Sequence, residues 1–141
     1  MKVIFPIKNG LPVNRRGIHV LDQAQVWQHA VVCNHAYAQD DARVFGNTQV
    51  LDHAQVRDQA YLGGQVVVRD QAVVAQNAWV SGNSVIEGHA MIKGHAEVID
   101  SVVKDAVVTG AARIQDAQIY GGHWDGAVVT GGSWLAPEVP T

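Results

Sequence analysis

Apolar residues recur at every sixth position over most of this chain. The column runs from Val20 to Val98 and holds Val, Ile or Leu at every place except Ala38. A small residue stands two positions before most members, and Ile18 and Val66 are the bulkier exceptions. A period of six fits neither a helix of 3.6 residues per turn nor the alternation of a hairpin. It is typical of a hexapeptide β-helix, in which a repeat buries its apolar residue only when neighbouring coils stack on it.

The second residue after each apolar position forms a column of its own. Apart from Gln28 and Gln76, its members are Gly, Asn and Asp. These residue types adopt positive φ at low cost. The column therefore predicts a corner with a left-handed residue at every sixth position. Its members are Asp22, Gln28, Asn34, Asp40, Gly46, Asp52, Asp58, Gly64, Asp70, Gln76, Gly82, Gly88, Gly94 and Asp100.

Polar residues follow directly after these corners. Gln, Asn, His and Asp side chains are able to hydrogen-bond to the equivalent residue of the next coil, as in ladders of stacked parallel strands. We therefore expect a side-chain ladder at this position. The column reads Gln23, His29, His35, Asp41, Asn47, His53, Gln59, Gln65, Gln71, Asn77, Asn83, His89 and His95.

The repeats also resemble a known family. Residues 78–83, 84–89 and 90–95 share the Ala/Ser-x-Val/Ile-x-Gly-Asn/His pattern of the left-handed parallel β-helix superfamily of hexapeptide-repeat proteins. Over residues 18–100 the chain is similar to YdcK-like and prophage-encoded bacterial proteins, many of them uncharacterised. The resemblance implies an all-β fold, a left-handed triangular coil with three hexads in each eighteen-residue turn. It also implies a phage or prophage origin, with a structural or counter-defence role.

The step shortens to five residues after Asp100, with one step of six. The inward residues become Val103, Val108, Ile114, Ile119, Trp124, Val129 and Trp134. Either the same coil loses one residue at each corner, or the chain changes into a pentapeptide-repeat coil. We favour the first interpretation, because a change of handedness would break the backbone hydrogen-bond ladder between coils.

The domain organisation follows from these steps. We expect an N-terminal cap over residues 1–17, a hexapeptide β-helix over 18–100, a continuation in five-residue steps over 101–136, and a tail over 137–141. Cap and tail would shield open sheet edges, which otherwise template aggregation. Gly122 and Gly132 precede two inward tryptophans by two positions, where alanine stands elsewhere. We expect them to make room for Trp124 and Trp134, and the coil to narrow and close at this end.

One outward face of the expected triangle is rich in aromatic residues. Residues eighteen apart stack about 4.8 Å from one another. This places Trp27 and Phe45 in one column, and Arg43, Tyr61 and Trp79 in the neighbouring one. Contiguous apolar surface usually marks an interface, and aromatic residues and Arg are enriched at its centre. The five residues are our candidate interface, although aromatic residues are also good strand formers.

Composition narrows the range of partners. The net charge of −3 and the pI near 6.1 give no basic footprint for nucleic acid. Cys33 is alone, so no intramolecular disulfide forms and the chain fits a reducing compartment. No run of about eighteen apolar residues is present for a membrane span. We expect a cytoplasmic protein, located in the host cytoplasm if it is phage-encoded.

The histidines give no assigned catalytic, metal or cofactor site. His29, His35, His53, His89 and His95 share the polar column after the corners, which favours a structural role. His35 and His53 are expected to stack, but two ligands do not make a zinc site. We therefore expect a noncatalytic scaffold that forms a homo-oligomer and binds a protein partner. The alternative is a trimeric acyltransferase-like enzyme with a site between subunits, as the resemblance allows.

Overall fold

The computed structural model describes residues 19–20, 24–26, 30–32 and 35–135. All regular structure in these residues is β, arranged as three sheets of seven parallel strands. The first sheet contains β1 (His19–Val20), β4 (Tyr37–Ala38), β7 (Gln55–Val56), β10 (Val73–Val74), β13 (Met91–Ile92), β16 (Val107–Thr109) and β19 (His123–Asp125). The second contains β2 (Gln25–Val26), β5 (Arg43–Val44), β8 (Tyr61–Leu62), β11 (Trp79–Ser81), β14 (Glu97–Ile99), β17 (Arg113–Gln115) and β20 (Val128–Thr130). The third contains β3 (Val31–Val32), β6 (Gln49–Val50), β9 (Val67–Val68), β12 (Val85–Glu87), β15 (Val102–Lys104), β18 (Gln118–Tyr120) and β21 (Ser133–Leu135).

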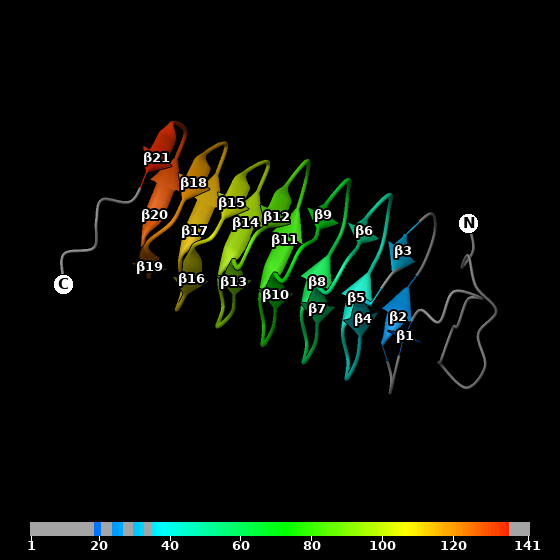
Figure 1. The fold of residues 1–141 in the computed structure, drawn as a ribbon. Coiled ribbons are helices and arrows are strands. Elements are labelled where there is room, and N and C mark those ends of the chain that lie inside the picture. The colour runs from blue at the N-terminus through cyan, green and yellow to red at the C-terminus, as the bar shows by residue number, and fades with distance from the viewer. Residues whose placement is uncertain (1–18, 21–23, 27–29, 33–34, 136–141) are drawn as a thin grey trace.

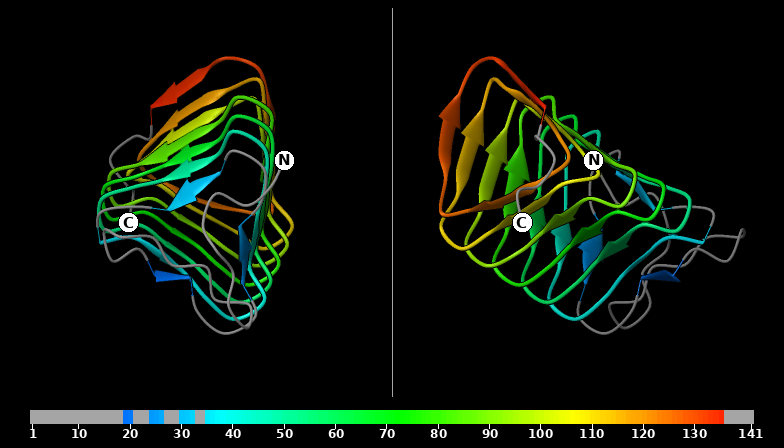
Figure 2. Two further views of the ribbon diagram at one scale, coloured as in Figure 1. Left: turned by 90° about the vertical axis from the view of Figure 1, so that its right-hand side faces the viewer. Right: turned by 60° about the vertical axis from the view of Figure 1, so that its left-hand side comes forward.

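Consecutive strands visit the three sheets in turn, so the chain advances as one coil from its N-terminal to its C-terminal end (Figure 1). Viewed along the coil axis, the three sheets form the sides of a triangle (Figure 2). This confirms the all-β triangular parallel β-helix. Its left-handed sense stays a prediction from the resemblance.

The core consists of the two columns that the sequence singled out. Every inward residue from Val32 to Ile119 has no exposed surface. The small residues two positions earlier are buried as well, from Ala24 to Ala117. A residue that is alanine at most positions stands beside each larger one and lets three sheets meet around a narrow interior, at the close packing that protein cores show. The interior therefore accommodates one larger and one small side chain from each six-residue repeat.

The coil shortens gradually towards the C-terminus. Val67 pairs with Val85, eighteen residues on, whereas Val85 pairs with Val102, seventeen residues on. Arg113 then pairs with Val128, only fifteen residues on. All three sheets nevertheless continue to their seventh strand. This is the outcome expected if one coil loses a residue at each corner, and the narrowing and closure of this end stay predictions.

The corners have the backbone conformation that the sequence predicts. Every described corner from Asp40 to Asp100 has positive φ, between 49° and 95°. Gln76 shares this conformation with φ 62°, although glutamine is not a usual residue for it. Asp22, Gln28 and Asn34 lie outside the described residues.

The side-chain ladder lies one residue earlier than predicted. The carboxylate of Asp58 accepts a hydrogen bond from the backbone N–H of Gln76 at 3.0 Å, and the amide oxygen of Gln76 accepts one from Gly94 at 2.8 Å. The acceptors are therefore the corner residues themselves. Asn47 and most of its described equivalents instead donate their backbone N–H groups to carbonyls of the next coil, whereas Asn83 and His89 donate theirs to the carboxylates of Asp100 and Asp105. The side chains of this column are exposed. The prediction of an Asn, Gln and His ladder was wrong, because the positive-φ residue is the one whose side chain reaches the neighbouring coil.

The last coil carries the two tryptophans. The indole N–H groups of Trp124 and Trp134 donate to the carbonyls of Gly121 and Gly131 at 2.8 Å. A Cβ on Gly132 would lie 3.1 Å from Trp134 Nε1, so this glycine makes room for the ring as expected. The predicted cap over 1–17 and tail over 137–141 lie outside the described residues. No helix long and apolar enough to span a membrane occurs in the described part of the chain.

Candidate interaction surface

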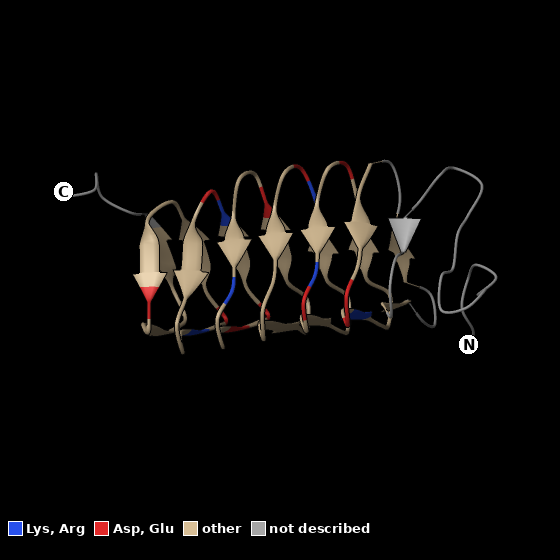
Figure 3. Cartoon of the chain, turned by 90° about the horizontal axis from the view of Figure 1, so that it is seen from below, with Lys and Arg blue, Asp and Glu red and all other residues tan. Residues whose placement is uncertain are grey.

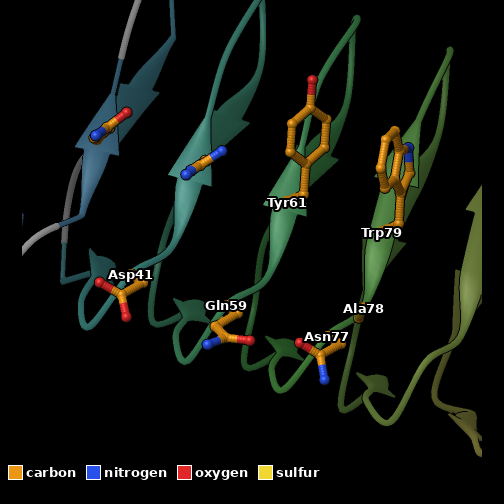
Figure 4. Close-up of a pocket in the computed structure, with 8 residues that line it drawn as sticks. Asp41, Gln59, Tyr61, Asn77, Ala78 and Trp79 are labelled. Atoms are coloured by element: carbon orange, nitrogen blue, oxygen red, sulfur yellow. The ribbon is translucent and has the colours of Figure 1, made fainter.

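Three aromatic side chains form a continuous ridge on the second sheet. The parallel register places Arg43, Tyr61 and Trp79 side by side on β5, β8 and β11. The rings of Tyr61 and Trp79 are stacked, with centroids 4.4 Å apart and planes 26° from parallel. The ring of Phe45 meets Tyr61 edge-on, with centroids 5.3 Å apart. We call Phe45, Tyr61 and Trp79 the aromatic ridge, two of whose rings are seen in Figure 4.

The orientation of the rings follows from their spacing. Neighbouring strands are about 4.8 Å apart, which is too close for two adjacent rings to lie flat on the sheet. The rings of Tyr61 and Trp79 therefore face each other and present their edges to solvent. Trp79 is 47% exposed, which makes it one of the few large apolar residues open to solvent in the described chain.

Gly63 makes room for the ridge. A Cβ at this position would lie 3.1 Å from Cε1 of Tyr61, closer than side chains ordinarily approach. Gly63 is buried although it stands in an outward column. The ring of Tyr61 thus leans along its strand over this glycine. A glycine that interrupts an aromatic column was the sequence signal for this arrangement, and the sequence analysis did not use it.

Two open pockets flank the ridge, and their linings differ. The first, of about 590 Å³, lies towards the corner that precedes the strands and is lined by Gln25, Asp41, Arg43, Gln59 and Asn77 beside the two stacked rings. Figure 4 shows Asp41, Gln59 and Asn77 in a row at this corner. The second, of about 520 Å³, lies on the opposite side of the ridge, and its lining includes Phe45, Ser81, Gly46, Gly63, Gly64 and Gly82. The ridge thus separates a polar hollow from one lined largely by glycine backbone.

Charges are sparse and lie mostly at the corners (Figure 3). Among the described residues Arg43 forms no ion pair, whereas Glu97 and Arg113 on the same sheet approach to 3.5 Å. On the third sheet the guanidinium of Arg69 donates to Glu87 at 3.0 and 2.5 Å. This hydrogen bond and the adjacent negative charge raise the pKa of Arg69. Arg43 therefore stands beside the ridge with its charge unmatched within the described chain.

The structure brings together four of the five predicted interface residues. Arg43, Phe45, Tyr61 and Trp79 share one face, and Trp27 lies outside the described residues. The pairing of β11 with β14 places Glu97 next to Trp79 in the same column. Glu97 therefore lies at the far end of the ridge from Arg43.

His35, His53, His89 and His95 lie at the corners, whereas His19 and His123 lie in β1 and β19. The rings of His35 and His53 stack as expected, with centroids 4.8 Å apart and planes 4° from parallel. Nδ1 of His89 lies 3.8 Å from a carboxylate oxygen of Asp105, and both side chains are more than half exposed. No group of three or more His, Cys, Asp or Glu side chains suited to a metal ion occurs in the described part of the chain.

The fold defines the class of this chain as a parallel β-helix with a solvent-facing aromatic ridge. No protein-family model matches the sequence, and comparison with curated proteins finds no match. The geometry of the ridge and its flanking pockets is therefore the basis for a functional proposal.

Proposed function

We propose that this protein is a noncatalytic β-helical scaffold that self-associates and binds a protein partner through the aromatic ridge. The observation that carries the proposal is the row of three aromatic rings on one sheet, with Trp79 47% exposed. Burial of such rings supplies a large part of the free energy of many interfaces. Arg43 beside the ridge adds a second residue type that is enriched at interface centres.

Rigidity supports the same proposal. The second sheet is hydrogen-bonded between all neighbouring strands, and its inward side chains are buried from Val44 to Val129. A surface on such a base loses little conformational entropy when it binds. A partner therefore meets a pre-organised surface. Under the phage-encoded origin that the resemblance implies, we propose that this scaffold has a structural or counter-defence role in the host cytoplasm.

A double substitution tests the proposal. Tyr61→Gln combined with Trp79→Gln removes both stacked rings and leaves the core untouched, because both side chains point outward. We expect a lower mass in sedimentation velocity and an unchanged β-rich circular dichroism spectrum. The matched control combines Tyr37→Gln and Tyr120→Gln, which remove tyrosines from the first and third sheets. The proposal fails if the Tyr61/Trp79 variant keeps the wild-type mass, or if the control loses as much association.

A further inference from the structure

We propose that a second copy of this chain covers the aromatic ridge in an antiparallel two-fold dimer. The two-fold axis runs parallel to the strands of the second sheet and passes between Tyr61 and Trp79. This inference rests on the self-association proposed above and specifies its geometry. The basis is that the second sheet is complementary to itself in charge and in side-chain size.

The charge pattern is the first reason. Arg43, Tyr61, Trp79 and Glu97 follow one another across four neighbouring strands in direct register. Arg43 and Glu97 are therefore equally distant from the line between the two rings, on opposite sides of it. The two-fold axis brings Arg43 opposite the partner's Glu97 and Tyr61 opposite the partner's Trp79. The unmatched charge of Arg43 thereby meets an opposite charge, and the aromatic rings meet each other.

The neighbouring column behaves in the same way. Ser81 pairs with Ile99, and the backbone N–H groups of Phe45 and Gly63 donate to the coil that follows, at 2.8 and 3.0 Å. The same axis brings Phe45 opposite the partner's Ile99 and Gly63 opposite the partner's Ser81. Apolar residues thus meet apolar residues, and small residues meet small ones. A two-fold interface needs a self-complementary surface of this kind.

The other two-fold arrangement is less favourable. An axis along the coil keeps the two copies parallel and exchanges the two outward columns. Arg43 would then face the partner's Phe45, and Glu97 would face the partner's Ile99. Charges would lose water without gaining an opposite charge, which is unfavourable at an interface. The ion pair of Glu97 with Arg113 is about half exposed, so Glu97 remains accessible to a second arginine.

The available area is enough for a dimer of modest affinity. The axis between β8 and β11 opposes six strands of each copy, β2 to β17, which are roughly 29 Å wide at about 4.8 Å per strand, and about five residues of each strand extend roughly 16 Å. As flat surfaces, two such faces together cover on the order of 900 Å², and side chains that project from them add to this area. This is close to the roughly 1,000 Å² that a specific interface needs. We therefore expect a dimer whose population depends on protein concentration.

Charge reversal tests this geometry. Arg43→Glu and Glu97→Arg are each expected to raise the dimer dissociation constant at least about tenfold in sedimentation equilibrium at low salt, because like charges then face each other. The double variant Arg43→Glu/Glu97→Arg restores the opposite charges and should return to within about threefold of wild type. The matched control is the same pair of reversals at Arg69 and Glu87 on the third sheet, which should leave the dissociation constant unchanged. Circular dichroism establishes that each variant is folded.

Cross-linking gives a second readout that does not depend on affinity. In a Cys33→Ser background, chains with Arg43→Cys and chains with Glu97→Cys are mixed and treated with a bismaleimide whose spacer is about 10 Å long, which matches the separation of sheets that pack face to face. The antiparallel dimer predicts a cross-linked dimer in the mixture and little with either variant alone, since two copies of residue 43 would lie roughly 17 Å apart, three strand spacings along the coil and one sheet spacing across it.

The outcomes separate this inference from the proposed function. A wild-type dimer whose association the double reversal fails to restore, or whose mixed cysteines do not cross-link, overturns the antiparallel geometry and leaves self-association intact. A wild-type chain that stays monomeric at all concentrations overturns both.

Discussion

Over their described residues, the hexad region (18–100) and the five-residue-step region (101–136) build the same three sheets with different corners. In the hexad region most strands are two residues long, whereas every strand from β14 onward has three. The coil shortens from eighteen to fifteen residues, and the strand pairing continues throughout. The constant feature of this fold is therefore the stacking of strands, and the corner between them is adjustable.

The two regions differ in how the corner N–H group is bonded. In the hexad region side chains of the preceding coil accept from it, as Asp58 does from Gln76. In the shorter coils backbone carbonyls replace them, so Gly126 donates to Thr109 at 3.0 Å. Where the step changes, the carboxylates of Asp100 and Asp105 instead accept from the preceding coil. When the corner loses one residue, its backbone N–H group therefore donates to a backbone carbonyl in place of a side-chain oxygen.

The largest expected contrast concerns the inward column. Val74→Asp buries an unpaired carboxylate among residues with no exposed surface, and we expect it to cost several kcal/mol or to prevent folding. Trp134→Asp changes an inward position that is 43% exposed in the last strand, and should cost only about 1–2 kcal/mol. Urea denaturation of both variants measures the contrast. A normally stable Val74→Asp variant would contradict the assigned register.

Alanine substitutions at two corner glycines with similar φ distinguish the cost of backbone strain from the cost of a steric clash with the next coil. Gly46 has φ 74° and a Cβ there would lie 2.5 Å from the carbonyl oxygen of Gly64, whereas Gly126 has φ 70° and a Cβ there would meet nothing within 4 Å. We expect Gly126→Ala to cost about 1 kcal/mol from the left-handed backbone alone. Gly46→Ala should cost about 2 kcal/mol more, because backbone atoms must move. Equal losses of thermal stability would show that the coils are not in such close contact.

Two buried hydroxyl groups in the small-residue column are expected to respond in opposite directions. Ser101 donates to the carbonyl of Ile99 at 2.7 Å and accepts from the N–H of Ala117 at 3.1 Å, whereas Thr48 Oγ1 has no hydrogen-bond partner among the described residues. Ser101→Ala should therefore destabilise the protein by about 1–2 kcal/mol. Thr48→Val removes an unpaired polar atom at nearly constant volume and should raise the free energy of unfolding by up to about 1 kcal/mol. Chemical denaturation checks both signs, and a destabilised Thr48→Val variant would indicate a partner for this hydroxyl.

The smallest expected effect concerns the corner carboxylates. Asp58 and Asp116 both have positive φ, but only Asp58 accepts a hydrogen bond through its side chain within the described residues. Replacing each by Ala imposes the same backbone cost, so the difference between the two variants isolates the hydrogen bond. We expect Asp58→Ala to be about 1 kcal/mol less stable than Asp116→Ala by thermal unfolding. The opposite order would indicate that the carboxylate ladder does not stabilise the hexad region.

The repeating column was sufficient to identify the core, because each inward residue from Val32 to Ile119 follows from the repeat steps. The strand register needed the three hexads per turn that the resemblance implies, and the observed pairing in the hexad region agrees with it. The position of the side-chain ladder was not predictable in the same way. Asn77 and its neighbour Gln76 are both able to hydrogen-bond, and only the positive φ of Gln76 decides which side chain reaches the next coil.

The candidate surface was predictable in membership but not in shape. Placement of Arg43, Tyr61 and Trp79 on one face required the period and the three hexads per turn that the resemblance implies. The stacked rings and the space that Gly63 provides depend on side-chain rotamers, which a repeat pattern does not specify. The strand pairing places Arg43 and Glu97 one strand beyond the stacked rings on either side, and this equal distance is what makes the face self-complementary in charge.

If the aromatic ridge makes this scaffold self-associate, sedimentation equilibrium of the wild-type chain will show it. The single chain has a mass of 15.2 kDa. We expect the weight-average mass to rise with protein concentration towards at least twice that value. A mass that stays at 15.2 kDa across the whole concentration range would contradict the proposed self-association and leave the ridge as ordinary exposed strand residues.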